Sequence, residues 1–237
     1  MKKIFLFITV AVGLFGTSCS KSSNSAEEES GENIDLGPSL VAVDIGLSVL
    51  WCSSNIGAVS PTDYGDYYAW AETEPKEEYT WATYKWCNGD SEYMTKYCYM
   101  SGYGHIDNIN TIRNTDDVAT VTLGSRWRIP TYDDFGDLIE TRSDSNYKWE
   151  WKKINGHRGW LVTYLVNGNR VFFPAAGGWG SEGKKVVGVE GHYWTSSIFP
   201  GGHPGYAYFF GIEEDDVYRW WAMRSAGYSI RPICRKD

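Results

Sequence analysis

The sequence predicts an α+β fold with two helices, many short strands and much irregular structure. Short apolar runs of strand type recur along the chain, and Gly, Pro, Asn or Asp bounds each of them. Helical patterns are confined to two segments in the middle of the chain. The chain also contains 26 Gly, 12 Trp and 17 Tyr, a composition that favours frequent turns between strands over long helices.

Residues 1–18 predict a bacterial lipoprotein signal peptide. Lys2 and Lys3 precede an apolar run, residues 4–15, that is too short to span a bilayer comfortably, and small residues then lead to Cys19. This order is similar to lipoprotein signals, in which the cysteine is lipidated and becomes the mature N-terminus. We therefore expect export and a membrane anchor on Cys19; the alternative is an ordinary secretory signal with a chance cysteine.

The segment after Cys19 predicts a tether followed by one domain. Residues 19–39 are polar and acidic, and they offer too little apolar surface to offset the entropy of ordering. Acids in this position resemble surface-export signals, which favours an outward-facing protein of the outer membrane. Residues 40–237 contain no second linker and predict a single domain. The net charge of −8 and the scattered basic residues argue against nucleic acid as a partner.

Two hairpins are predicted from short signals. In "VTYLVNGNRVFF", residues 162–173, an Asn-Gly turn joins two apolar runs, which is a strong hairpin signal. In "FFGIEEDDVYRWW", residues 209–221, acidic residues crowd the expected turn. Further strand-like runs are "LSVLWCSSN", "YYAWAE", "GHYWTSS" and "GYSIRPIC".

The first predicted helix lies in "TDDVATVTLG", residues 115–124. Thr115 is the expected N-cap, acids occupy the first turn and Gly124 follows the end. The β-branched residues in this segment weaken its helix propensity.

The second helix follows the stretch "GSRWRIPTYDDFGDLI", residues 124–139. Thr131 can cap the helix with Asp134 three residues later, as in a capping box, and the apolar residues that follow share one face. Arg128 is expected to bind carbonyls or a carboxylate inside the fold. We interpret the whole stretch as a device that holds the fold together, not as an active site.

Four cysteines follow Cys19, and an exported protein can form disulfides. We expect a disulfide between Cys87 and Cys98, with buried free thiols as the alternative. The other two are Cys52 and Cys234.

Several motifs occur in a fixed order along the chain: "VDIGLSVLWCSSNIGAVSPTDYGDYYAWAETEP", "DDVATVTLGSRWRIPTYDDFGDLI", "FFPAAG", "HYWTSS" and "GYSIRPI". Together they resemble the Fibrobacter succinogenes major paralogous domain, abundant in surface lipoproteins of gut Bacteroidales, over residues 41–233. The resemblance implies a C-type-lectin-like fold, related to the formylglycine-generating-enzyme superfamily, in which two helices flank small antiparallel sheets. It also implies ligand contacts on the last strands and loops, here residues 199–228.

The sequence singles out no catalytic constellation. Cys234 is alone after Cys98, whereas the sulfatase-modifying relatives need a late pair of cysteines. The match of "GWGSEG", residues 178–183, to a dinucleotide motif lacks the helix that should follow it. The four histidines (His105, His157, His192 and His203) have no zinc spacing, and we expect them to be exposed or locally bonded. We therefore expect no enzyme; a polysaccharide-acting enzyme is the alternative.

Calcium of the lectin type is not supported, and no other cofactor is expected. Residues 74–76, Glu-Pro-Lys, are the only partial match to the sugar-binding triplet of C-type lectins, and a lysine stands where that triplet has an amide ligand. A structural calcium around Asp107, Asn108 and Asn110, or around residues 213–216, stays open beside the alternative of solvated acidic turns.

The last hairpin is the predicted binding surface. Strand alternation places Tyr218 and Trp220 on one face and Arg219 and Trp221 on the other, so both pairs cannot belong to one core. Tyr, Trp and Arg carry much of the binding energy at interfaces. The predicted ligand-binding residues are Tyr206, Tyr218, Trp220 and Arg224. We expect a non-catalytic binding or adhesion module for a glycan or protein ligand, or, failing that, a structural component of a surface assembly.

Overall fold

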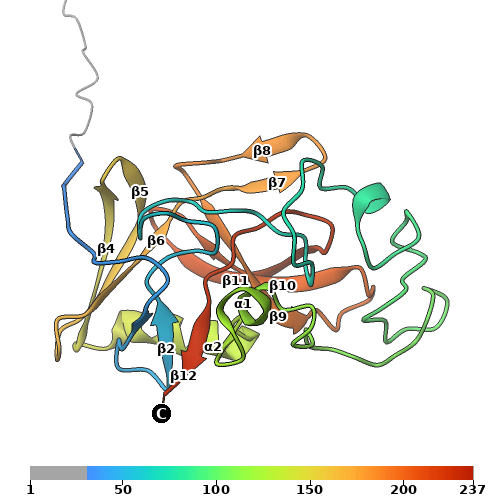
Figure 1. Cartoon of the computed structure of the whole chain (residues 1–237), viewed down its shortest axis with the longest axis horizontal. Coiled ribbons are helices and arrows are strands. Elements are labelled where there is room, and N and C mark those ends of the chain that lie inside the picture. The colour runs from blue at the N-terminus through green and yellow to red at the C-terminus, as the bar shows by residue number, and fades with distance from the viewer. Residues whose placement is uncertain (1–30, 237) are drawn as a thin grey trace, which may run out of the picture.

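The computed structural model describes residues 31–236, and it has the predicted α+β character (Figure 1). The signal peptide and Cys19 lie outside the described residues. The first sheet has the strand order β1-β2-β12-β3. Its strands are β1 (Ala42–Val43), β2 (Val49–Cys52), β12 (Ile233–Arg235) and β3 (Trp127–Arg128). It joins the two ends of the folded chain, because β2 and β12 pair antiparallel.

The other sheets are antiparallel units of neighbouring strands. The order β4-β5-β6 comprises Tyr147–Ile154, His157–Tyr164 and Arg170–Pro174. The order β11-β10-β9 comprises Val217–Met223, Tyr206–Ile212 and Gly191–Ile198. A two-stranded hairpin pairs β7 (Gly178–Gly180) with β8 (Gly183–Lys185). The α-helices are α1 (Val118–Leu123) and α2 (Tyr132–Glu140), and two 3₁₀ helices span Trp81–Thr83 and Thr141–Ser143. No described helix has the length and apolar character needed to cross a bilayer.

Both predicted hairpins are confirmed. β5 and β6 are joined through Asn167 and Gly168, and Gly168 has the positive φ of 77° that the Asn-Gly signal implies. β10 and β11 are joined by a tight turn at whose base Glu213 and Asp216 exchange backbone hydrogen bonds of 2.9 and 3.3 Å.

The capping box of α2 is confirmed, and it binds Arg128. The Thr131 hydroxyl accepts a bond from the Asp134 amide, and the Asp134 carboxylate accepts one from the Thr131 amide. Arg128 donates to both oxygens of Asp134, at 2.7 and 3.0 Å. Burial alone would raise the pKa of Asp134, but the bonds from Arg128 and Thr131 outweigh it and hold the pKa below its ordinary value. These bonds attach β3 to the first turn of α2, as the interpretation of this stretch as a structural element predicts.

The predicted cap of α1 is wrong by two residues. Asp117 caps this helix in place of Thr115, because one carboxylate oxygen accepts from the Thr120 amide and the other from the Ile129 amide. One side chain thus satisfies the helix start and the strand-like segment beside it.

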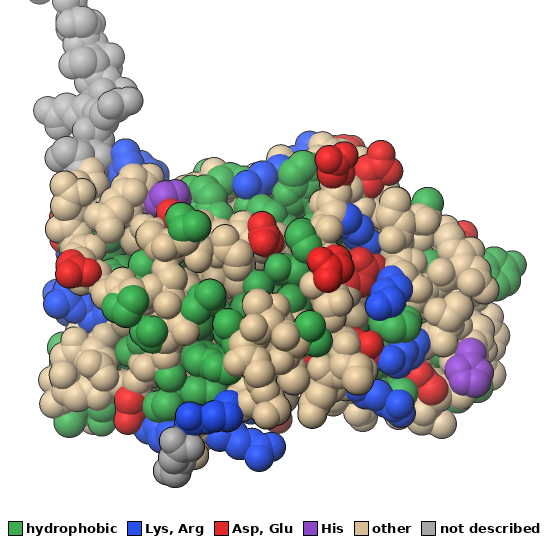
Figure 2. Space-filling model, viewed as in Figure 1, with side chains coloured by type: hydrophobic (Ala, Val, Ile, Leu, Met, Phe, Trp, Pro, Cys, Tyr) green, Lys and Arg blue, Asp and Glu red, His purple; other side chains and the backbone are tan. Residues whose placement is uncertain are grey.

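The sheet of β9, β10 and β11 separates two hydrophobic cores. Strand alternation sends Phe210 and Ile212 toward α2, Trp51 and Phe173, while Phe209 and Trp194 pack against Trp70 and the long segment before α1. Figure 1 shows α2 below this sheet and the β7–β8 hairpin above it. On the face in Figure 2, acidic, basic and hydrophobic side chains are interspersed.

The domain begins earlier than predicted. Glu32 pairs with β4, through bonds of 2.8 Å to the Lys153 carbonyl and 3.0 Å from the Asn155 amide. Ile34 and Leu36 pack against the buried cluster of Ile154, Leu161 and Phe172. The two apolar side chains gain enough burial to order a segment whose average composition is polar, so part of the predicted tether belongs to the domain.

The predicted Cys87–Cys98 disulfide is not formed in the structure. Both residues are buried free thiols. The Cys87 sulfur lies 3.2 Å from the Trp81 carbonyl and the Cys98 sulfur 3.4 Å from the Met100 carbonyl. Each thiol therefore bonds within its own loop, which residue spacing alone could not reveal.

Candidate functional site

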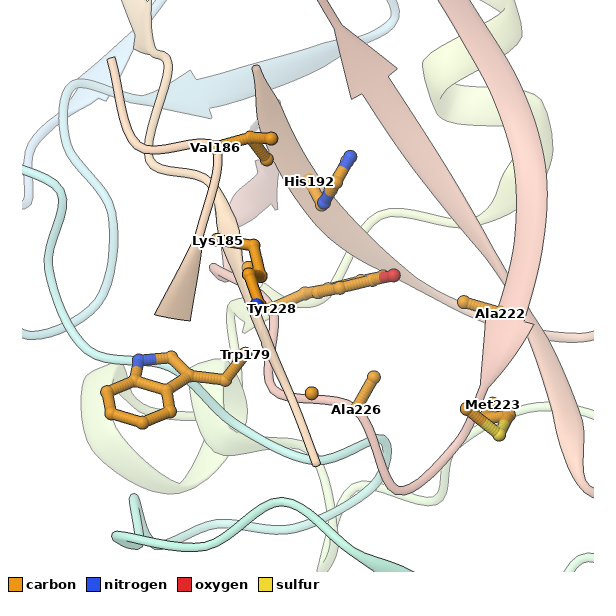
Figure 3. A pocket seen from close by; sticks show the side chains of 10 residues that line it. Trp179, Lys185, Val186, His192, Ala222, Met223, Ala226 and Tyr228 are labelled. Carbon is orange, nitrogen blue, oxygen red and sulfur yellow. The ribbon is translucent and has the colours of Figure 1, made fainter. Parts of the chain in front are cut away.

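A shallow pocket of about 210 Å³ lies between the β7–β8 hairpin and the β9–β11 sheet. We call it the hairpin groove (Figure 3). Its walls are mostly apolar, and the lining residues come from β7, β8, β9 and β11 and from the segments that follow β8 and β11. The lining residues are Gly178, Trp179, Gly180, Lys185, Val186, His192, Ala222, Met223, Ala226 and Tyr228.

Strand register builds the floor of this region. Tyr218, Gly211 and His192 lie in one row across β11, β10 and β9, and Trp220, Phe209 and Trp194 form the next row. The Tyr218 ring lies over Gly211, where an added Cβ would come within 2.4 Å of it. Glycine is therefore required there for the tyrosine to lean toward β9. Tyr228 covers the rows, with its ring centroid 4.4 Å from that of Trp194.

Polar groups gather near one end of the groove. Glu190 Oε2 lies 3.3 Å from Nε2 of His192, while Nδ1 of His192 is buried without a hydrogen-bond partner among residues 31–236. Burial, with Glu190 next, raises the pKa of Tyr218 to about 12, and burial, Tyr218 and Glu190 raise the pKa of Tyr228. Both phenols are therefore neutral, and neither hydroxyl has a hydrogen bond to another described residue.

His192 makes the stability of the fold depend on pH. Burial lowers its pKa from 6.5 to about 4. Between pH 6.5 and pH 4 this histidine is protonated in the unfolded chain but stays neutral in the folded one. The free energy of unfolding therefore decreases as the pH falls from 6.5 toward 4. At about 1.4 kcal/mol per pKa unit, the loss is on the order of 3 kcal/mol.

His192→Gln should therefore flatten this part of the stability–pH profile, measured by urea unfolding at several pH values from 7 to 4. The exposed residue His105, changed to Gln, serves as the control. An unchanged profile in the His192 variant would show that another group causes the acid sensitivity.

The structure brings together two of the four predicted binding residues. Tyr218 and Trp220 share the face that carries the groove, and Trp220 is 58% exposed. Tyr206 lies on the opposite face, where its ring contacts Trp221 at 4.9 Å. Arg224 is wholly buried and bonds to groups inside the fold, so its assignment to a ligand surface is wrong.

The sequence did not single out Glu190, His192 or Tyr228, although Tyr228 ends the range, residues 199–228, that the resemblance implied for ligand contacts. His192 was expected in an exposed or locally bonded turn, but it belongs to strand β9 and is largely buried. The run "GHYWTSS" did carry a usable signal, since alternation places His192 on the same face as Trp194. Tyr228 and Glu190 lie in irregular segments, and no periodic sequence pattern predicts where the side chains of such segments point.

In each of the two segments considered for calcium, at least one carboxylate already has protein partners. The Asp107 carboxylate accepts the amides of Tyr97, Cys98 and Ile109. Asp216 Oδ1 lies 3.0 Å from Nη1 of Arg142. Within residues 31–236 no three His, Cys, Asp or Glu side chains are grouped to hold a metal.

No protein-family model, curated protein or solved structure matches the chain.

Proposed function

We propose that the protein is an exported lipoprotein, anchored to the outer membrane through Cys19 and facing outward. Its single domain, of C-type-lectin-like fold, would bind a glycan or a protein ligand without catalysing a reaction. The signal-like N-terminus supports the location. The hairpin groove, open to solvent on the last strands, supports the binding role.

The composition of the groove favours a glycan. A sugar ring presents C–H groups on its faces and hydroxyls at its rim. The apolar wall of Val186, Met223 and Ala222 suits the faces, and the hydroxyl of Tyr228 suits the rim. Tyr218 does not line the groove, but it shares a strand row with the lining residue His192 and adds a second hydroxyl beside it. The single observation that carries the proposal is this pairing of an apolar wall with unpartnered polar groups beside it.

The enzyme alternative lacks support in the described residues. Catalysis by paired carboxylates needs two of them across the reacting bond. No carboxylate lines the groove among residues 31–236; Glu190 and Glu182 lie beside it, 3.3 Å from Nε2 of His192 and 3.1 Å from Nζ of Lys185. The assembly alternative rests on a different feature, the free edge of β11.

A glycan and surface-protein screen of the purified protein tests the proposal. Tyr228→Phe and Tyr218→Phe each remove one hydroxyl and keep the ring packing, so the fold should survive while Kd rises roughly tenfold, about the free energy of one hydrogen bond. Tyr93→Phe removes a hydroxyl from a residue that is 61% exposed and far from the groove in sequence, and it should leave Kd unchanged.

Three other outcomes would change the assignment. A ligand that binds both groove variants as tightly as the wild type would place the site elsewhere. A protein hit without a glycan hit would keep the module and change the ligand class. No hit at all would contradict a recognition role.

A further inference from the structure

The outer edge of β11 carries a regular row of backbone groups. Glu213 and Asp216 exchange both hydrogen bonds at the turn, so antiparallel alternation fixes which later residues bond to β10. Tyr218, Trp220 and Ala222 point their backbone groups toward β10, and the bond from Arg224 to Gly205 continues the pattern. The outward-facing residues are Val217, Arg219, Trp221 and Met223.

Two of the eight outward groups are already satisfied. The Val217 amide donates to Asp216 Oδ1 at 2.8 Å, and the Met223 carbonyl accepts from the Ala226 amide at 2.9 Å. Six remain: the amides of Arg219, Trp221 and Met223, and the carbonyls of Val217, Arg219 and Trp221. None of these six has a partner in the described part of the chain, where β11 pairs with β10 alone.

The sequence of this edge also lacks the usual protection against pairing, although the Trp220 and Trp221 rings stack on each other, with centroids 6.0 Å apart, and must turn aside when a second strand pairs. Natural edge strands are commonly blunted by Pro, Lys or a bulge, and β11 reads "VYRWWAM". The guanidinium of Arg219 is turned onto α2, where it bonds the Tyr132 carbonyl at 2.9 Å. Trp220 and Met223 remain 58% and 47% exposed.

We propose that two copies of this chain pair through β11 as an antiparallel homodimer, with the twofold axis beside Trp220. In this register Arg219 lies opposite Trp221 of the second copy, and Val217 lies opposite Met223. All six free groups of each copy then find partners. The Val217 amide and the Met223 carbonyl face each other, and these are the two groups that each copy already satisfies internally.

Neighbouring registers fit less well. With Arg219 opposite Arg219, the carbonyl of Trp221 meets the occupied amide of Val217, and the Met223 amide lies beyond the end of the second strand. With Trp221 opposite Trp221, the amide of Arg219 meets the occupied carbonyl of Met223. The pattern of free groups therefore selects one register.

Side chains agree with that register. Trp220 faces Trp220 of the second copy in a non-hydrogen-bonded pair, with Cα atoms about 4.5 Å apart, and aromatic cross-strand pairs stabilise sheets. Met223 meets Val217, which covers an exposed thioether. The acidic turns lie at opposite ends of the pair, roughly 35 Å apart at about 3.3 Å per residue, well beyond the Debye length of about 8 Å.

The twofold contact pairs the free β11 edge of each copy with that of the other. The assembly is therefore closed as a dimer and does not extend into a fibre. The two three-stranded sheets become one six-stranded sheet, and both hairpin grooves lie on the same face of it. Such a dimer would present two binding sites to one surface, which raises avidity without any new contact to the ligand.

Co-expression of two differently tagged full-length copies tests the pairing, with capture of one tag and detection of the other. The wild type should be captured with its partner. Trp220→Lys and Trp220→Glu should each lose capture, because like charges meet at the axis. A Trp220→Lys copy mixed with a Trp220→Glu copy should regain it, since the two side chains then attract.

Controls separate this result from misfolding and from ligand binding. Each variant is checked by thermal unfolding, and Tyr93→Lys, another exposed aromatic changed to Lys, should retain capture. Tyr228→Phe should also retain it, because Tyr228 lies outside the proposed contact. Absence of wild-type capture, retention of capture by folded Trp220→Lys, or failure of the Lys and Glu copies to pair would each overturn the proposal.

Discussion

Replacing Arg231 with alanine is expected to leave little folded protein. Arg231 is wholly buried, and its guanidinium donates to Oδ1 of Asn55 at 2.8 Å, the Cys52 carbonyl at 3.0 Å and the Phe172 carbonyl at 2.8 Å. A buried acceptor that loses its donor costs about 1–3 kcal/mol. Three such acceptors together approach the 5–15 kcal/mol that holds a typical domain folded.

No carboxylate faces this guanidinium among the residues that the structure describes. Its charge is balanced by carbonyl and amide oxygens and by the ring of Phe173, whose centroid lies 4.9 Å from the guanidinium carbon. Burial lowers the pKa of Arg231 from its ordinary value, but arginine remains charged. The side chain thus joins β2, the loop after it and β6, which are far apart in sequence.

Three further variants separate the causes of the loss, measured by urea unfolding. Arg231→Met restores most of the side-chain volume, so its difference from alanine reports the cavity. Arg231→Lys keeps the charge but cannot reach three acceptors with one ammonium, and it should be nearly as damaging as alanine. Arg142→Ala breaks a surface pair and should cost at most about 1 kcal/mol. Stable Arg231→Ala protein would contradict this account.

Local sequence patterns predicted turns and helix caps correctly, but they did not predict contacts between residues distant in sequence. The Asn-Gly turn, the acidic turn and the capping box at Thr131 each depend on residues within a few positions, and each prediction is confirmed. The cap of α1 was misplaced because Asp117 also serves Ile129, a partner twelve residues away that a helix rule does not consider.

The residues of the candidate site were likewise predicted only where strand alternation applies. Alternation correctly separated Tyr218 from Arg219, because a strand has only two faces. It could not identify the residues that cover those faces, since Tyr228 and the β7–β8 hairpin arrive from irregular segments. It also failed beyond the end of β11, where Arg224 enters the core.

Arg224→Ala is expected to destabilise the fold by at least about 3 kcal/mol and to act on binding only through unfolding. Arg224 Nε donates to the Tyr84 hydroxyl at 2.9 Å, and Nη1 donates to the carbonyls of Pro204 at 3.0 Å and Tyr97 at 3.1 Å. Its guanidinium carbon lies 4.7 Å from the ring centroid of Trp70. These contacts attach the end of β11 to the irregular segment before α1.

The test compares thermal unfolding and ligand binding in the same preparations of Arg224→Ala and Trp220→Ala. Arg224→Ala should unfold at much lower temperature, because four oxygen acceptors, the three above and the Lys96 carbonyl, lose their donor together with the cation over the Trp70 ring. Trp220→Ala should lower the unfolding temperature much less, because Trp220 is 58% exposed in each copy and removing it costs only its contacts with the second copy. The reverse pattern, a stable Arg224→Ala protein that no longer binds ligand, would return Arg224 to the binding surface. The burial of its guanidinium argues for the first result, since a ligand could reach that group only after the contacts around it had opened.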